Sequence, residues 1–115
     1  MSTITLILND APYGSERSYN GLRTALALQK KNTLVNVFLI ADAVYCALKD
    51  QTTPDGYYNI GRMIRGVTGK GKISVCGVCM DARGLANLQS MDKVHRSSMA
   101  ELADWILNSD KVITF

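Results

Sequence analysis

The sequence has no apolar stretch long enough to span a membrane and no block of five or more like charges. A bilayer needs about 20 consecutive apolar residues, whereas the first apolar run ends at Asn9 and Asp10. The 13 basic and 10 acidic residues give a net charge of only +3, so we expect neither nucleic acid nor a membrane as partner. The N-terminus also lacks the basic start of a signal peptide. These absences predict a cytoplasmic protein.

Residues that hold metals or nucleotides are scarce as well. The chain has one histidine, His95, and three cysteines, which leaves a Cys76/Cys79 zinc half-site short of its two further ligands. Neither the G-x-G-x-x-G nor the G-x-x-x-x-G-K-[ST] pattern of phosphate-binding loops occurs. An odd number of cysteines without an export signal indicates reduced thiols. We therefore expect no cofactor and no metal.

The length of 115 residues, with 47% of them hydrophobic, suits one globular domain over residues 1–115. Within it, apolar runs rich in β-branched residues alternate with helical patterns. The expected strands cover residues 4–8, 34–40, 72–75, a minor 93–95 and 111–115.

Each expected helix begins near a polar side chain that can accept a hydrogen bond from the first helical turn. These caps are Ser15 or Ser18, Asp42, Asn59 and Ser98. Ser98 and Glu101 have the spacing of a capping box. A turn around residues 85–88 follows the third strand. The last helix should bury one apolar face, made of Met99, Leu102, Ala103, Ile106 and Leu107.

This alternation predicts a three-layer α/β/α sandwich with a mostly parallel sheet of four to five strands. In such sheets, ligands gather outside the carboxyl ends of the strands. The loops at residues 9–15, 41–44 and 76–84 should emerge there. We therefore expect Asn9, Tyr13 and Asp42 to lie near the cysteine loop as possible site residues.

The stretch Cys76-Gly77-Val78-Cys79-Met80-Asp81-Ala82-Arg83-Gly84 can be interpreted as a metal half-site, a redox dithiol or a sulfur-carrying nucleophile. No strongly helical pattern follows Cys79, so we expect residues 80–84 to form a loop. Such a loop favours a sulfur anion held by Arg83 and by backbone amides that Gly84 makes accessible. Asp81 is a further possible site residue.

Several motifs in order resemble the YchN-type branch of the DsrE/DsrF/TusD sulfur-relay family. They are Asn9 to Glu16, Asp42-Ala43-Val44, Gly56 to Ile60, Cys76-x-x-Cys79-x-Asp81-x-Arg83-Gly84 and the ending Ser109 to Phe115. The resemblance runs from the first strand to the last residue. It implies a compact α/β fold and a homo-oligomer, most simply a hexamer of two trimers, with the cysteine loop near subunit contacts.

The resemblance also implies a function in sulfur transfer. In the relay proteins, a cysteine at a strand end carries a persulfide, and it precedes an Arg-Gly pair by a fixed spacing. That spacing assigns Cys76 as the carrier, and Cys79 could resolve the persulfide by forming a disulfide. Sulfur donor and acceptor proteins would then be partners. Two alternatives remain open: a non-catalytic oligomeric interaction module with incidental cysteines, and a Cys76/Cys79 dithiol oxidoreductase.

Overall fold

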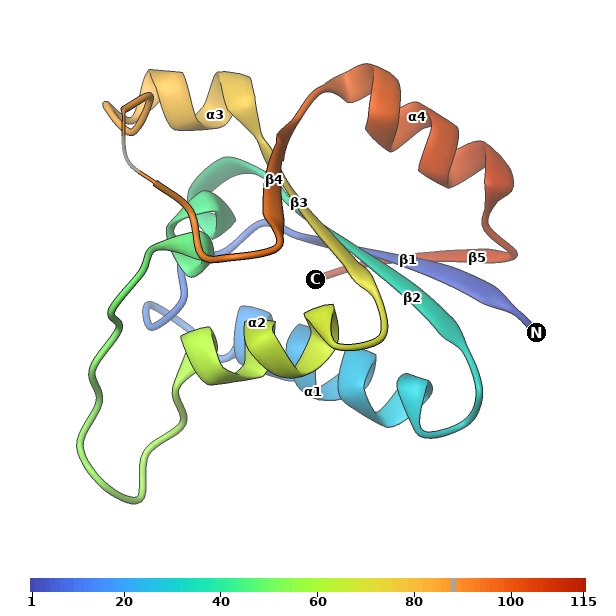
Figure 1. The fold of residues 1–115 in the computed structure, drawn as a ribbon, viewed down its shortest axis with the longest axis horizontal. Helices are drawn as coiled ribbons and strands as arrows, with labels where there is room; N and C mark the ends of the chain where they lie inside the picture. Colours follow the sequence, from blue (N-terminus) through green and yellow to red (C-terminus); the bar gives the residue numbers. More distant parts are fainter. Residues whose placement is uncertain (88) are drawn as a thin grey trace.

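The five strands form a single sheet in which every neighbouring pair is parallel. The computed structural model describes residues 1–87 and 89–115, and its strand order is β4-β3-β2-β1-β5 (Figure 1). The strands are β1 (Thr3–Leu8), β2 (Leu34–Leu39), β3 (Lys72–Cys76), β4 (Val94–Ser97) and β5 (Lys111–Thr114). The predicted α/β fold is confirmed, with the sheet entirely parallel.

Helices cover both faces of this sheet (Figure 1). One layer holds α1 (Arg17–Gln29) and α2 (Ile60–Thr68), and the other holds α3 (Gly77–Ala82) and α4 (Met99–Asn108). A 3-10 helix, η1 (Ala41–Ala47), follows β2. The turn expected around residues 85–88 includes Leu88, which lies outside the described residues.

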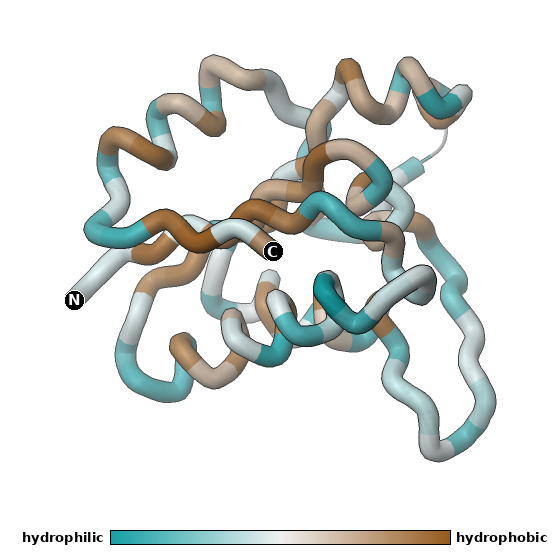
Figure 2. The backbone as a smooth tube through the Cα atoms, turned by 180° about the vertical axis from the view of Figure 1, so that it is seen from behind, coloured by the Kyte–Doolittle hydropathy of each residue, from teal (hydrophilic) through white to brown (hydrophobic). Residues whose placement is uncertain are grey.

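The face of the sheet toward α1 and α2 is apolar along the three central strands. Leu8 faces α1, because a Cβ added at Gly21 of α1 would collide with its side chain. Paired residues of parallel strands share a face, so the register extends this apolar surface across β2 and β3. Its buried side chains include Leu6, Leu8, Val37, Leu39, Ile73 and Val75. In Figure 2, the brown of hydrophobic residues follows the central strands.

The opposite face, toward α4, is more polar. Phe38 meets Trp105 edge to face at 5.9 Å between ring centroids. Beside it, Ser74 donates a hydrogen bond to the Glu101 carboxylate at 2.8 Å.

Helix α4 therefore buries little apolar surface on this sheet face. Leu102 is buried as expected, but Met99, Ile106 and Leu107 are 50%, 42% and 82% exposed. The prediction that one whole apolar face of this helix enters the core was wrong. The periodicity identified the helix, but the sheet beneath it offers too few apolar partners.

Two of the four predicted helix caps are confirmed. The Asn59 side chain accepts a hydrogen bond from the Arg62 amide at 3.0 Å, and the Ser98 hydroxyl accepts one from the Glu101 amide at 3.5 Å. The capping box is only half formed, because the Glu101 carboxylate accepts hydrogen bonds from the hydroxyls of Ser74 and Ser97.

The other two predicted caps do not directly precede their helices. Glu16 directly precedes α1 and makes no side-chain cap. One residue earlier, the Ser15 hydroxyl accepts a hydrogen bond from the amide of Arg17, the first residue of α1, at 3.3 Å and donates one to the Asp10 carboxylate at 2.7 Å. Ile40 precedes η1, which places Asp42 inside its first turn. The minor strand expected at 93–95 begins at Val94 and extends to Ser97.

None of the helices in residues 1–87 and 89–115 has both the length and the apolarity that crossing a membrane requires.

Gly71, just before β3, provides a test of this packing. A Cβ there would collide with the Val35 carbonyl oxygen and approach the Gln29 side-chain nitrogen to 2.8 Å. We expect Gly71→Ala to lower the free energy of unfolding by about 1–3 kcal/mol, measured by urea denaturation. At Gly14, the added Cβ would meet only Ala11 at an ordinary 3.7 Å, so Gly14→Ala is the matched control. Equal losses in the two variants would contradict this account.

Candidate functional site

Cys76 ends β3 and directly precedes α3. Its backbone is extended, and its Sγ accepts a hydrogen bond from the Cys79 amide at 3.4 Å. The residue is only 4% exposed. The prediction of a loop after Cys79 was therefore wrong, since residues 77–82 are helical and the sulfur of Cys76 caps the helix. Helix propensity did not predict this turn, because Cys76, Gly77 and Cys79 are residue types that form helices poorly.

Cys79 lies in α3 and is the more accessible of the two sulfurs. Its Sγ accepts a hydrogen bond from the Ala41 amide at 3.3 Å. Ala41 has φ = 53°, a left-handed conformation that costs a non-glycine residue about 1–2 kcal/mol. This strained residue is the first of η1, so the turn after β2 presents its N–H to the sulfur. Such strain is typical of positions where backbone geometry serves a site.

Arg83 and Asp42 lie at the outer end of this arrangement. The Arg83 Nε donates to Asp42 Oδ1 at 2.9 Å, and its terminal nitrogen Nη1 donates to the Cys79 carbonyl at 3.2 Å. Gly84 follows in a left-handed conformation, with φ = 71°, where α3 ends. Arg83 therefore ties η1 to α3 on the Cys79 side of the site.

Asp81 pairs with a residue that the sequence did not suggest. The Arg96 guanidinium donates to both Asp81 carboxylate oxygens, at 2.9 and 2.7 Å. This bidentate pair holds the pKa of Asp81 below its usual range. Arg96 was missed because the minor strand was expected to stop at His95. The available signal was its place one residue beyond His95, on a strand beside β3.

A cavity of about 560 Å³ lies over the two cysteines. Besides Cys76 and Cys79, its walls include the apolar side chains of Ile40, Val78 and Met99. Small-molecule sites commonly have this size and an apolar lining with few polar groups. The cavity is therefore where a small reactant could reach both sulfurs.

Burial controls the acid–base state of Cys76. It raises the pKa of the Cys76 thiol above its ordinary value, and the hydrogen bond from the Cys79 amide acts in the opposite direction. A lowered thiol pKa would favour the reactive thiolate of a sulfur carrier, and burial acts against it here. The site therefore keeps Cys76 mostly protonated at neutral pH while providing an N–H donor for the anion.

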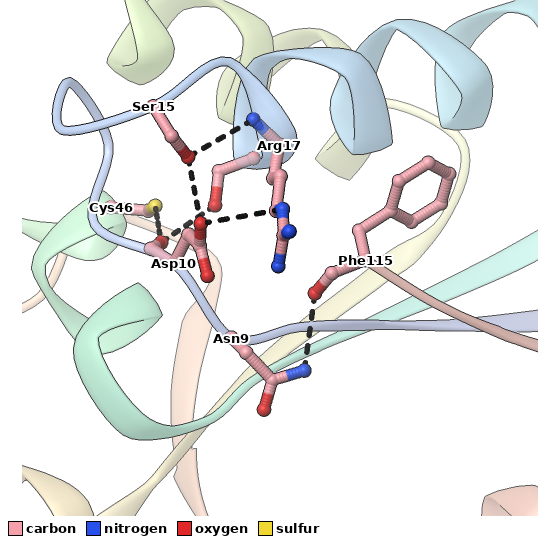
Figure 3. Close-up of polar contacts among 7 residues, drawn as sticks. Asn9, Asp10, Ser15, Arg17, Cys46 and Phe115 are labelled. Carbon is pink, nitrogen blue, oxygen red and sulfur yellow. Dashed lines mark hydrogen bonds and ion pairs between the residues drawn. The ribbon is translucent and has the colours of Figure 1, made fainter.

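The third cysteine lies apart from this cavity. Cys46 of η1 is fully buried, and its Sγ donates to the Asp10 carbonyl at 3.8 Å (Figure 3). Burial raises its pKa to about 12. A protonated, buried thiol is a poor nucleophile, so Cys46 is a structural residue.

The loop after β1 forms its own hydrogen-bond network. The Asn9 side chain donates to the Phe115 carbonyl at 3.1 Å (Figure 3), and the Asn9 amide donates to the same oxygen at 3.1 Å. The Tyr13 hydroxyl donates to Gln51 at 2.6 Å and accepts from the Ile60 amide at 3.1 Å. Asn9 thus fastens β5 to the sheet edge, and Tyr13 fastens the loop before α2. These contacts hold the segment as a hydrogen-bonded turn.

Within residues 1–87 and 89–115, no three His, Cys, Asp or Glu side chains gather closely enough to hold a metal ion.

The chain is similar to known proteins over its whole length. Protein YchN of Escherichia coli strain K12 is 41% identical over 118 residues, covering 100% of both chains. An uncharacterised protein of Methanopyrus kandleri, MK0008, is 35% identical, covering 100% of this chain and 95% of its own length.

Solved structures support the same relationship. The crystal structure of the YchN protein from E. coli superposes with a TM-score of 0.94 at 40% identity, with 100% of both chains covered. MTH1491 of Methanobacterium thermoautotrophicum, a protein of unknown function, shares the fold at a TM-score of 0.77 and 11% identity, again over 100% of both chains. The DsrE/DsrF-like family model matches residues 2–115. The chain therefore belongs to the DsrE/DsrF-like family.

Proposed function

We propose that this protein handles sulfur by accepting sulfane sulfur as a persulfide on Cys76 and passing it on. The observation that carries the proposal is that Cys76 and Cys79 line one cavity and each sulfur accepts a backbone N–H. Membership of the DsrE/DsrF-like family supports a sulfur-related role. Donor and acceptor would be thiol compounds or protein thiols that can reach this cavity.

The transfer is a displacement at sulfur and needs no cofactor. The Cys76 thiolate attacks the outer sulfur of a donor R–S–SH. The donor S–S bond breaks, R–S⁻ leaves with the electron pair, and Cys76–S–SH forms. Attack by an acceptor thiolate on the outer sulfur reverses these steps and restores the Cys76 thiolate. Backbone N–H groups stabilise the anions without moving, because the helix and the strained turn hold them in place.

Cys79 gives the persulfide a second fate. Its thiolate can attack the inner sulfur of Cys76–S–SH, forming a Cys76–Cys79 disulfide and releasing HS⁻ with the electron pair. The sulfane sulfur is thereby reduced to sulfide while the two thiols are oxidised. Cys79 would then end the sulfur transfer whenever no acceptor is present.

A dithiol oxidoreductase is the second candidate, and the structure supplies an observation in its favour. Helix α3 begins directly after Cys76, with the Cys79 amide donating to the Cys76 sulfur. This arrangement resembles C-x-x-C sites in which the first cysteine precedes a helix. It differs in exposure, because Cys76 is buried and Cys79 is the more accessible sulfur.

Mass spectrometry of the intact, reduced protein with a small persulfide donor tests the proposal. We expect the parent to gain one sulfur mass, Cys79→Ser to keep that sulfur longer because its resolving thiol is gone, and Cys76→Ser to gain none. Cys46→Ser is the matched control and should load like the parent, since Cys46 lies outside the cavity.

The other outcomes identify the competing functions. A loss of two hydrogens without sulfur uptake, when a disulfide oxidant replaces the persulfide donor, would favour the dithiol oxidoreductase. Sulfur uptake by Cys76→Ser equal to that of the parent would show that the carrier assignment is wrong. Cysteines that resist both sulfur and alkylating reagents in the folded protein would favour the interaction module.

The pKa direction of Cys76 predicts how its reactivity depends on pH. The thiolate is the reactive form, and a raised pKa lowers its fraction at neutral pH. The rate of Cys76 alkylation by iodoacetamide, followed by peptide mass spectrometry, should rise nearly tenfold per pH unit from pH 7. It should continue to rise past the usual thiol pKa of about 8.5. A plateau below that pH would contradict the role of burial.

We also propose that copies of this chain associate through α4 and β5. Exposed apolar side chains gather on these two elements, among them Leu107 at 82% and Val112 at 39% exposure, and grouped exposed apolar residues are typical of interfaces. Light scattering coupled to size exclusion should give an oligomer, with the hexamer as the specific expectation. Leu107→Glu should reduce its mass, whereas Tyr57→Glu, at an exposed loop residue, should not. A parent that runs as single chains would contradict this proposal.

A further inference from the structure

Arg96 forms part of the wall of the cavity over the cysteines. It reaches this place from β4, where Arg96 pairs with Val75, one residue before Cys76 on the neighbouring strand. Arg96 is the only charged residue among the described residues that line the cavity. Its side chain is half exposed and paired with Asp81, so its attraction for an anion is partial and should weaken as salt concentration rises. The cavity thus favours a small reactant with negative charge.

Gly77 provides the space for this guanidinium. A Cβ added at Gly77 would lie 2.8 Å from both Cζ and Nε of Arg96, far inside van der Waals contact. The arginine therefore lies directly against the backbone of the first residue of α3, which follows Cys76 in the chain. Any side chain at position 77 would displace it.

Asp81 fixes the orientation of the guanidinium. The two terminal nitrogens of Arg96 bond to Asp81, and Nε has no hydrogen-bond partner within the described part of the chain. A bidentate carboxylate occupies one edge of the planar group and defines its direction. Asp81 also offsets the arginine charge, so it holds Arg96 in position and weakens its attraction for an anion.

We propose that Arg96 binds the negative end of a small anionic sulfane-sulfur donor, of the class of inorganic polysulfide, beside Cys76, with Asp81 as a positioning residue. This inference rests on the proposed function and adds its substrate class. For the smallest such donor, HS–S⁻, the Cys76 thiolate attacks the sulfur that carries the proton. The S–S bond breaks, HS⁻ leaves with the electron pair and that proton, and Cys76–S–S⁻ remains. No other oxidant or reductant is required.

Two alkylating reagents of different charge test the anion site without requiring sulfur transfer. The probes are iodoacetate and iodoacetamide, applied to the reduced full-length protein at one pH, with Cys76 modification read by peptide mass spectrometry. The ratio of their rate constants cancels the thiolate fraction and reports the local charge. Arg96→Gln should lower this ratio about threefold, a typical effect of one partly screened charge. Gly77→Ala should lower it as well, because it displaces the same guanidinium.

The two members of the ion pair should have opposite effects, which a structural role would not produce. Asp81→Asn should raise the iodoacetate preference, whereas Arg96→Lys should retain part of it. Arg62→Gln, on α2 across the sheet, removes an exposed charge away from the cavity and should leave the ratio unchanged. An unchanged ratio in Arg96→Gln would overturn the proposal. Equal losses in Arg96→Gln and Asp81→Asn would also overturn it, since they would indicate that the pair only supports α3.

Loading with sodium polysulfide then tests the substrate class. The parent should gain sulfur several times faster than Arg96→Gln, and Asp81→Asn should gain it faster than the parent. Equal polysulfide uptake by Arg96→Gln and the parent would overturn the donor assignment. No sulfur uptake by the parent from any donor would refute the proposed function and this donor assignment with it. The alkylation ratio would still decide separately whether Arg96 attracts anions to Cys76.

Discussion

The parallel register of the three central strands determines where every candidate residue lies. Leu8, Leu39 and Val75 form one row across β1, β2 and β3, so the residues that follow them open onto the same sheet edge. Side chains alternate along a strand, and a slip of one residue in β3 would turn Cys76 to the other face. The same register places Ser97 opposite Cys76. The cavity therefore depends on the packing that fixes this register.

That packing is strong on one sheet face and weak on the other. The face under α1 and α2 is apolar and fully buried, which fixes the strands through the hydrophobic effect. Under α4 lie polar side chains, and Asn36 Oδ1 is buried without a hydrogen-bond partner within the described part of the chain. Only Leu102 of α4 is buried. Packing therefore stabilises the position of α4 less than it stabilises the strands that carry the cysteines. The same holds for Met99, the residue of α4 that lines the cavity.

The fold was predictable because its signals are redundant along the chain. Apolar β-rich runs, helical spacing and caps such as Asn59 all agree with a parallel α/β sheet, and errors in the Ser15 and Asp42 caps moved helix starts without changing the topology. Those two side chains had other uses: Ser15 bonds to Asp10, and Asp42 bonds to Arg83. Local propensity does not reveal such tertiary competition.

The site was less predictable because its key contacts join distant segments. The sequence identified the two cysteines and the family motif. The Ala41 N–H, however, reaches Cys79 only because Ala41 adopts a left-handed conformation, and an alanine in the sequence gives no sign of such a conformation. Helix α3 was missed because its cap is a sulfur rather than an oxygen. Arg96 comes from a strand whose end could not be located from its weak apolar pattern. The need for a glycine at position 77 becomes visible only when the position of the Arg96 side chain is known.

Charge balance explains why a buried thiol suits this site. Arg83 pairs with Asp42, and Arg96 pairs with Asp81, so these four side chains sum to zero. A thiolate on Cys76 therefore adds a charge that burial disfavours, which is the direction of its pKa shift. The Cys79 amide, which donates to the Cys76 sulfur, offsets part of that cost. In the proposed anion site, Asp81 and an incoming anionic donor compete for the Arg96 guanidinium. The strength of this ion pair would therefore act together with burial of the thiol in setting how readily Cys76 reacts with such a donor.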